Sequence, residues 1–438
     1  MIHLQRAPQL SREWGEGHRT ICRNLLGNLQ TWPTSVLDVG MGLPAVLIIV
    51  IACLLLGTSP PQKIGIVDGI HVIQNEKGGK FARGLPIALE LIQSIGDIDT
   101  EDENLAFNLP EDLAVDEAGN IYILDSGNHR VQKFSPARKY LATIGRRGQG
   151  PGEFNYPQRL DLDSEGNIYV LDRNQARIQV INPSGKEIKT IRIDLKTLDM
   201  DFLQPGRLVI TTSLGYEYIS KKIRDEGSPK LVKIIDLEGN VLTEFVEPMD
   251  FGGPQINDMG NYSIMATDKN GNIYLTYLIR NQIDKYASDG KHLWSATRVL
   301  NFDSQLEFKG RTAAKGAAIP TEIVNSAQSS SGISVDDKGR IWVVTLNRQM
   351  KKDEWSGTMA GFGKSGNVAF SRVVGDKAFL EQRKTDIFKL EVFDSEGNLL
   401  GDIPLAHFAD RIFIHKDNLF VLDKMHASTF YQYKIIDK

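Results

Sequence analysis

The chain has 438 residues, of which 41% are apolar and 24% are charged, and this composition excludes a disordered chain. Its net charge of −4 provides no field that would attract phosphate backbones, so we expect no nucleic-acid partner. The two cysteines, Cys22 and Cys53, both precede the repeats described below. Those repeats therefore contain neither a disulfide nor a cysteine-ligated zinc.

Residues 1–40 show no apolar periodicity, and we expect them to be unstructured or cytoplasmic. Segment 41–57 carries no charge and is just long enough to span a bilayer, so it predicts a transmembrane anchor or a signal segment. Four arginines precede it, whereas the first basic residue after it is Lys63. This bias predicts that the rest of the chain lies outside the cytoplasm, in the periplasm or on the cell surface. A buried core helix is the alternative for 41–57.

The tetrapeptide Val50–Cys53 resembles the box before the lipidated cysteine of bacterial lipoproteins, which makes Cys53 a candidate for lipid attachment. Against this, residues 54–56 continue the apolar run beyond the cysteine. The segment is therefore retained, cleaved or lipidated, and the sequence leaves these alternatives open. Residues 58–84, with two prolines and a pair of glycines, predict a linker.

Internal repeats organise the rest of the chain. Residues 113–125 and 160–172 are nearly interchangeable, with the shared core Gly-Asn-Ile-Tyr followed by an aspartate. Each copy places β-branched and aromatic residues on both sides of a short Asp/Gly/Asn turn, which is typical of a β-hairpin. Weaker copies occur at 264–275, 333–343 and 411–423, and a degenerate copy occurs at 205–211.

A second hairpin follows most copies, so each unit has four strands, named a to d in chain order. The last copy lacks its d strand, and residues 87–96 match a d strand without a blade of their own. The sequence therefore predicts an all-β fold: a six-bladed β-propeller over 85–438 that the N-terminal strand closes, preceded by the short apolar membrane segment. The pattern of proline before each copy, Gly-Asn-Ile-Tyr within it and Asn128-x-Arg130 after it resembles the NHL-repeat family of six-bladed propellers.

Loop lengths predict which face binds. The a–b and c–d turns lie on one face and are short, whereas long insertions at 212–230, 300–331 and 346–388 all fall on the opposite face. Long loops on only one face of a rigid scaffold indicate a binding surface there. The alternative is that loop length has drifted neutrally. Aromatic and cationic residues in these insertions are candidate ligand contacts: Tyr216, Tyr218, Arg348, Trp355 and Phe362.

Other motifs indicate structure. Asp125 with Arg130 recurs one repeat later as Asp172 with Arg177, and a pair that repeats from blade to blade is typical of architecture. The glycines of 145–152 precede no helix, which favours a blade connector over a phosphate site. No histidine spacing is that of a zinc helix, although His129 and His426 fall at similar places in neighbouring blades.

Two functions remain open. The first is a non-enzymatic binding module whose loop-rich face holds a protein, peptide or glycan, a use that resembles that of many NHL-type propellers. The second is a metal-dependent hydrolase or lyase with its site at the central channel, as in six-bladed propellers of related shape. The sequence assigns no catalytic residue, no metal ligand and no cofactor.

Overall fold

The computed structural model describes residues 63–81, 84–203, 206–214, 229–251, 254–304, 307–312, 321–325, 327–351, 358–362, 368–372 and 382–438. The chain divides into two units, 1–59 and 60–438, and every element named below belongs to the second. Within the described part, no helix combines the length and the apolar character needed to cross a bilayer. Segment 41–57 and Cys53 lie outside the described residues.

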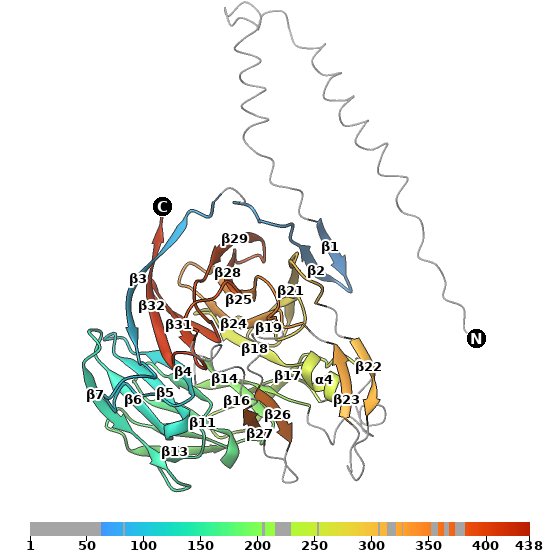
Figure 1. Ribbon diagram of the computed structural model, residues 1–438. Coiled ribbons are helices and arrows are strands. Elements are labelled where there is room, and N and C mark those ends of the chain that lie inside the picture. The colour runs from blue at the N-terminus through green and yellow to red at the C-terminus, as the bar shows by residue number, and fades with distance from the viewer. Residues whose placement is uncertain are drawn as a thin grey trace, which may run out of the picture. The chain divides into compact units, whose positions relative to one another are not determined.

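Six blades, each with four antiparallel strands, form a propeller, and their innermost strands contact one another around a ring (Figure 1). This arrangement confirms the predicted six-bladed β-propeller. The first three blades are β4(Pro110–Val115), β5(Ile121–Asp125), β6(Arg130–Phe134) and β7(Tyr140–Ile144); β10(Arg159–Leu162), β11(Ile168–Asp172), β12(Arg177–Ile181) and β13(Glu187–Arg192); β14(Thr197–Leu203), β15(Arg207–Thr212), β16(Val232–Asp236) and β17(Val241–Phe245).

In the fifth blade an extra hairpin separates the second and third strands along the chain, and the sixth blade takes its outermost strand from the N-terminal end of the propeller sequence. They are β18(Ser263–Thr267), β19(Ile273–Tyr277), β20(Ile283–Tyr286) and β21(His292–Thr297); β24(Ser330–Val335), β25(Ile341–Leu346), β28(Phe388–Phe393) and β29(Leu399–Pro404); β30(Arg411–His415), β31(Asn418–Asp423), β32(Thr429–Asp437) and β3(Ile87–Ile95).

A short sequence pattern explains the tight hairpins. In Asp-x-x-Gly-Asn, the aspartate accepts the backbone N–H of the asparagine, as in Asp116 and Asn120 at 2.8 Å, and the glycine adopts the positive φ that the turn requires. The same bond recurs in a–b turns at Asp163 and in c–d turns at Asp236. The repeats therefore encode their turns locally.

β3 is the outermost strand of the sixth blade. It pairs antiparallel with β32, from Ile87 opposite Asp437 to Ile95 opposite Phe430. Ile95 is fully buried in the cluster that joins the sixth blade to the first, and Thr429 Oγ1 donates to its carbonyl at 3.1 Å. Two ends of the propeller sequence thus share one sheet.

The fourth blade carries an additional hairpin, β1(Lys63–Val67) and β2(Ile70–Gln74), with β2 parallel to β21. This hairpin lies within residues 58–84, where a linker was expected. Its turn, Asp68–Gly69, has positive φ at both residues, which is the geometry of a two-residue hairpin. The prolines and glycines on either side favour a linker, but the Asp68–Gly69 turn between them lets the two short strands pair.

The repeated Asp and Arg pairs are architectural, as predicted. Asp125 and Arg130 are directly opposite in β5 and β6, with Arg130 Nε 2.8 Å from Asp125 Oδ2. Arg177 Nη2 is likewise 3.2 Å from Asp172 Oδ2, and it also donates to the carbonyl of Glu153 at 2.7 Å. These pairs tie each b–c turn to the connector from the previous blade.

The remaining elements connect the blades. The turn after β5 is the 3₁₀ helix η3(Ser126–Asn128), and the turn after β11 is η4(Arg173–Gln175). The predicted connector 145–152 contributes β8(Arg146–Arg147), which pairs with β9(Glu153–Phe154). Longer connections contain α4(Pro254–Gly260) and the hairpins β22(Glu307–Thr312) with β23(Thr321–Asn325) and β26(Thr358–Phe362) with β27(Val368–Arg372).

Candidate functional site

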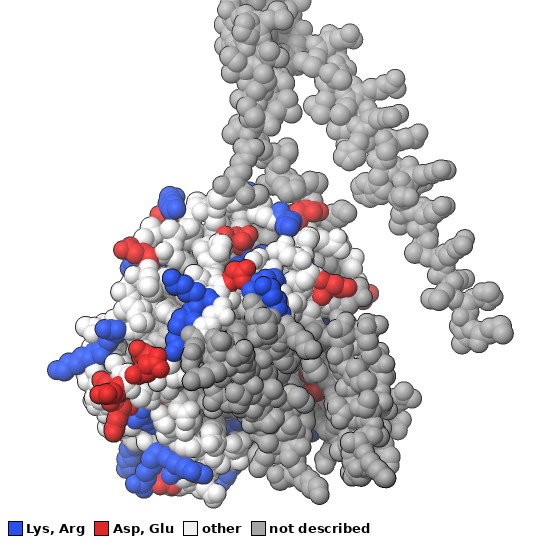
Figure 2. Space-filling model, viewed as in Figure 1, with Lys and Arg blue, Asp and Glu red and all other residues white. Residues whose placement is uncertain are grey.

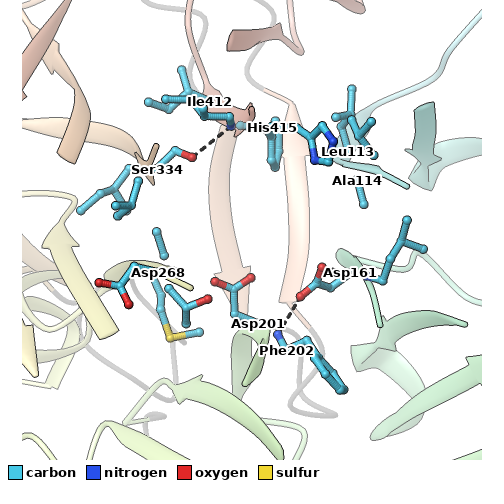
Figure 3. Close-up of a pocket in the computed structure, with 18 of the residues that line it drawn as sticks. Leu113, Ala114, Asp161, Asp201, Phe202, Asp268, Ser334, Ile412 and His415 are labelled. Atoms are coloured by element: carbon cyan, nitrogen blue, oxygen red, sulfur yellow. Dashed lines mark hydrogen bonds between the residues drawn. The ribbon is translucent and has the colours of Figure 1, made fainter. Parts of the chain in front are cut away.

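The six innermost strands surround a cavity of about 460 Å³ at the ring axis (Figure 3). Side chains two residues apart on a strand point to the same side, so axial residues lie in successive layers. The layer at the start of the strands is named here the ion-pair tier, and it consists of Asp112, Arg159, Asp199 and Arg411. The layer two residues further along contains Asp161 and Asp201, named here the acidic pair.

The ion-pair tier spans the axis. Arg159 Nε lies 2.5 Å from Asp199 Oδ1, and Arg411 Nη2 lies 3.2 Å from the same oxygen. Arg411 Nε is also 3.6 Å from Asp112 Oδ1. Because β14 and β30 belong to the third and sixth blades, which are opposite in a ring of six, the contact between Arg411 and Asp199 spans the axis.

Burial and charge act in opposite directions in this tier. Burial tends to raise the pKa of Asp199, but the Arg159 and Arg411 guanidiniums hold that pKa below its ordinary value. At Asp112 burial dominates, and its pKa rises to about 6 despite the same two arginines. Asp112 Oδ2 also accepts the N–H of Leu160 at 2.8 Å, which links the first blade to the second. The tier is therefore a structural network whose charges satisfy one another.

The acidic pair faces the cavity (Figure 3). Asp161 accepts two backbone N–H groups, from Phe202 at 2.6 Å and from Leu162 at 2.7 Å. Burial raises the pKa of Asp161 to about 6. Burial and the neighbouring Asp161 and Asp199 carboxylates raise the pKa of Asp201 well above its ordinary value, and the Arg411 charge and a hydrogen bond with Thr267 partly offset this. Two neighbouring buried carboxyls favour the retention of a proton, because burial and their mutual repulsion both oppose full ionisation.

The cavity extends to the face that carries the short turns. Its lining includes residues 268–271, between β18 and β19, and residues 336–337, between β24 and β25. Lys269 and Asp337 in these turns are exposed. His415 also lines the cavity, and its Nε2 is buried without a hydrogen-bond partner among the described residues. Burial and the nearby Lys416 lower the pKa of His415, so its neutral form is favoured.

The donors around the cavity do not fit a divalent metal. Within the described ranges, no three His, Cys, Asp or Glu side chains are grouped so that they could hold one. The two histidines at similar blade positions have separate surroundings. His129 Nδ1 accepts the N–H of Tyr156 at 3.0 Å, whereas the His426 ring stacks on Phe408 with centroids 3.5 Å apart.

A serine, a histidine and an aspartate meet in the fourth blade without forming a catalytic triad. The His292 Nε2 atom is 3.1 Å from Ser295 Oγ and 3.5 Å from Asp284 Oδ1, so one nitrogen faces both partners. Ser295 also donates directly to Asp284 at 2.5 Å. A triad needs the aspartate on one ring nitrogen and the nucleophile on the other, so this cluster is structural.

Long connections collect on the opposite face, named here the loop-rich face. By strand direction, the b–c connections 213–231 and 347–387 and the d–a connection 298–329 all belong to it. The hairpins β22–β23 and β26–β27 lie within two of these connections. Figure 2 shows basic and acidic side chains interspersed over the described surface in this view, with no extended area of one charge.

The structure describes the positions of two of the five predicted ligand contacts, Arg348 and Phe362. Arg348 lies just after β25, and its Nε donates to Asp386 Oδ1 at 2.8 Å, which joins the two ends of one insertion. Phe362 is the last residue of β26. Tyr216, Tyr218 and Trp355 lie outside the described residues.

Sequence reasoning missed the axial residues. Asp112, Arg159, Asp199 and Arg411 all stand near the start of an innermost strand, and the aligned repeats carry a charged residue there in four of six blades. The available signal was this shared offset from the a–b turn.

Residues 92–335 match the model of a family described as 6-bladed beta-propeller, DUF5128. No curated protein matches the chain by sequence. A DUF4221 family member from Bacteroides vulgatus is 11% identical, with 80% of this chain and 99% of that chain covered and a TM-score of 0.50. A putative exported protein from Bacteroides fragilis has 10% identity, coverage of 84% and 99%, and a TM-score of 0.47. Virginiamycin B lyase from Staphylococcus aureus has 12% identity, coverage of 80% and 100%, and a TM-score of 0.42. At such identities the similarity shows the fold alone.

Proposed function

Because the chain belongs to the DUF5128 family of six-bladed β-propellers, we propose that it is a membrane-held binding module whose loop-rich face engages a protein, peptide or glycan. The repeat pattern supports a propeller of the NHL type. The pairing of β3 with β32 supports a ring that its N-terminal strand closes. The uncharged segment 41–57 and the arginines before it support an anchor or signal segment with the propeller in the periplasm or on the cell surface.

The one-sided placement of the insertions carries this proposal. A rigid blade positions the loops at its ends, and extra loop length costs little, about 0.6 kcal/mol per doubling. The ion-pair tier lies at the start of the innermost strands, which is the end of the axis next to the loop-rich face. A partner on that face would therefore meet a surface of loops above an axis that ion pairs cross, which suits a macromolecule better than a small substrate.

Site-specific photo-crosslinking tests the proposal. A photo-reactive residue replaces Lys384, an exposed residue of the loop-rich face, or Lys269, an exposed residue at the cavity mouth. The full chain is irradiated in its native membrane. We expect an adduct of defined mass from position 384 and none from 269. An adduct from 269 alone would contradict the proposal, because it would move the binding surface to the cavity.

Topology has a separate test. Protease added to intact cells, or to cells whose outer layer has been made permeable, should degrade the propeller if it lies outside the cytoplasm. A propeller that stays intact until the cytoplasmic membrane is broken would contradict the proposed orientation. Mass analysis of the N-terminal peptide would show whether Cys53 carries a lipid.

The acidic pair supports a second candidate, a hydrolase or lyase at the central cavity. Asp201 has a raised pKa and faces about 460 Å³ of space, so its protonated carboxyl could donate a proton to a substrate held there. Because the donor set does not fit a divalent metal, this candidate rests on the protein's own acid and base groups.

Turnover of a panel of lactones by the purified full chain tests the second candidate. Activity that Asp201→Asn abolishes and that Asp337→Asn leaves unchanged would support it, since Asp337 lies exposed at the cavity mouth. Activity that survives Asp201→Asn would overturn it. A stoichiometric divalent ion that is released in Asp201→Asn would show that the cavity does bind a metal, contrary to the fit described above.

A further inference from the structure

Strand β1 presents an unusually apolar edge. Ile64, Ile66 and Val67 are 62%, 68% and 58% exposed. β1 pairs with β2 on one side, and among the described residues no strand pairs with its other side. An exposed apolar edge strand of this kind is a site for association unless something covers it.

The hairpin is held firmly to the propeller. Asn75, just after β2, donates to the carbonyls of Thr297 at 3.1 Å and Gly397 at 2.9 Å, and its Oδ1 accepts the N–H of Leu399 at 2.7 Å. Ile73 is buried with Trp294 and Leu399 in the core between the fourth and fifth blades. β1 therefore has a fixed position at the edge of the fourth blade, and its exposed side chains point into solvent from that position.

The position of β1 in the chain indicates what covers it. The uncharged segment 41–57 ends five residues before β1 begins at Lys63. At about 3.6 Å per residue or less, residues 58–62 reach no further than roughly 20 Å. A chain anchored in lipid by 41–57 thus keeps β1 close to the headgroup region, which extends several ångströms on each side of the hydrocarbon core.

We infer that β1 docks onto the lipid surface through its exposed side chains, Ile64 and Ile66 on one face of the strand and Val67 on the other, and fixes how the propeller sits at the membrane. This inference rests on the proposed anchoring. Between Lys63 and Asp68 the strand contains no charged residue, so the docked side chains desolvate no charge. Three aliphatic side chains bind a bilayer weakly alone, but a short tether makes the contact intramolecular and raises its occupancy.

Photo-crosslinking to lipid tests the inference in the full chain, reconstituted in vesicles of phosphatidylcholine and phosphatidylglycerol. A benzoylphenylalanine residue replaces Ile66 or, as a matched control, Leu141, which is 45% exposed on β7 of the opposite blade. We expect lipid adducts from position 66 to exceed those from 141 by about tenfold, because the tether holds only the fourth blade near the bilayer. The double change Ile64→Asp and Ile66→Asp, with the probe at Val67, should abolish the adducts without changing flotation.

Each outcome has a distinct meaning. A chain that floats with the vesicles but gives equal lipid adducts at 66 and 141 overturns the docking while anchoring stands. Adducts of twice the chain mass at position 66 also overturn it, because they show that a second copy covers β1 by edge pairing. A chain that does not float overturns both the anchoring and the docking that depends on it.

Discussion

Arg411 reaches across the ring axis to Asp199, with Nη2 3.2 Å from Oδ1, although the two residues are 212 positions apart in sequence. Arg159, from the second blade, donates to the same carboxylate oxygen. Asp199 is 2% exposed, so its charge depends on these two guanidiniums in place of water. The centre of the propeller is therefore stabilised by charge balance as well as by apolar packing.

Removal of this carboxylate should be costly. Asp199→Ala leaves Arg159 and Arg411 short of a buried partner, and we expect the free energy of unfolding to fall by about 3–5 kcal/mol. Urea unfolding followed by circular dichroism measures it. The matched control is Glu238→Ala, which breaks the exposed 2.8 Å pair between Lys189 and Glu238 across the second and third blades and should cost at most about 1 kcal/mol. Equal losses in the two variants would contradict a stabilising role for the tier.

The raised pKa of Asp112 predicts a pH dependence. Its folded pKa is about 6 and its ordinary value is 3.8, so the folded state binds the proton more tightly. The stability contributed by this carboxyl is present below about pH 4 and is lost as pH rises through about 6, by up to about 3 kcal/mol. Unfolding at several pH values should therefore show that wild type loses stability relative to Asp112→Asn between pH 4 and 7. A constant difference over this range would show that burial does not raise the pKa.

The innermost strands of the fifth and sixth blades approach closely at a glycine. A Cβ added at Gly332 would lie 3.0 Å from the Ile412 nitrogen and 3.2 Å from the Arg411 Cα. Gly332→Ala should therefore destabilise the protein by about 1–3 kcal/mol, because backbone must move. Gly65→Ala in β1 is the control, since no atom of the described part of the chain lies within 4 Å of its added Cβ, and it should be neutral or slightly stabilising. A neutral Gly332→Ala would refute the close approach.

Strand β3 tests the proposed closure. Ile95 is fully buried where the sixth blade meets the first, whereas Leu91 on the same strand is 55% exposed. Ile95→Ala should lower the free energy of unfolding by about 2–5 kcal/mol, and Leu91→Ala should change it by less than about 0.5 kcal/mol. Thermal and urea unfolding of both variants measure the difference. If Ile95→Ala proved as mild as Leu91→Ala, β3 would not seal the ring.

Local features of the fold were predictable, because each tight turn is determined by side chains within five consecutive residues. Asp116 and Asn120, for example, build their hairpin through their own side chains. The β1–β2 hairpin could have been found in the same way from Asp68–Gly69. The ion-pair tier and the acidic pair could not be assigned contacts in advance, because Arg411 meets Asp199 only after six blades have closed into a ring. The loop-rich face followed from connection lengths, but most of its predicted contact residues lie outside the described part.

The central claim is that the loop-rich face, and not the central cavity, binds the partner. The direct measurement is the affinity of the full chain for the crosslinked partner once identified, compared with two variants. One variant replaces residues 352–381 by a short Gly-Ser linker, and the other is Asp201→Asn. We predict that the loop replacement weakens binding at least about tenfold, or about 1.4 kcal/mol, while Asp201→Asn leaves it unchanged. Weaker binding in Asp201→Asn with full affinity in the loop variant would contradict the claim.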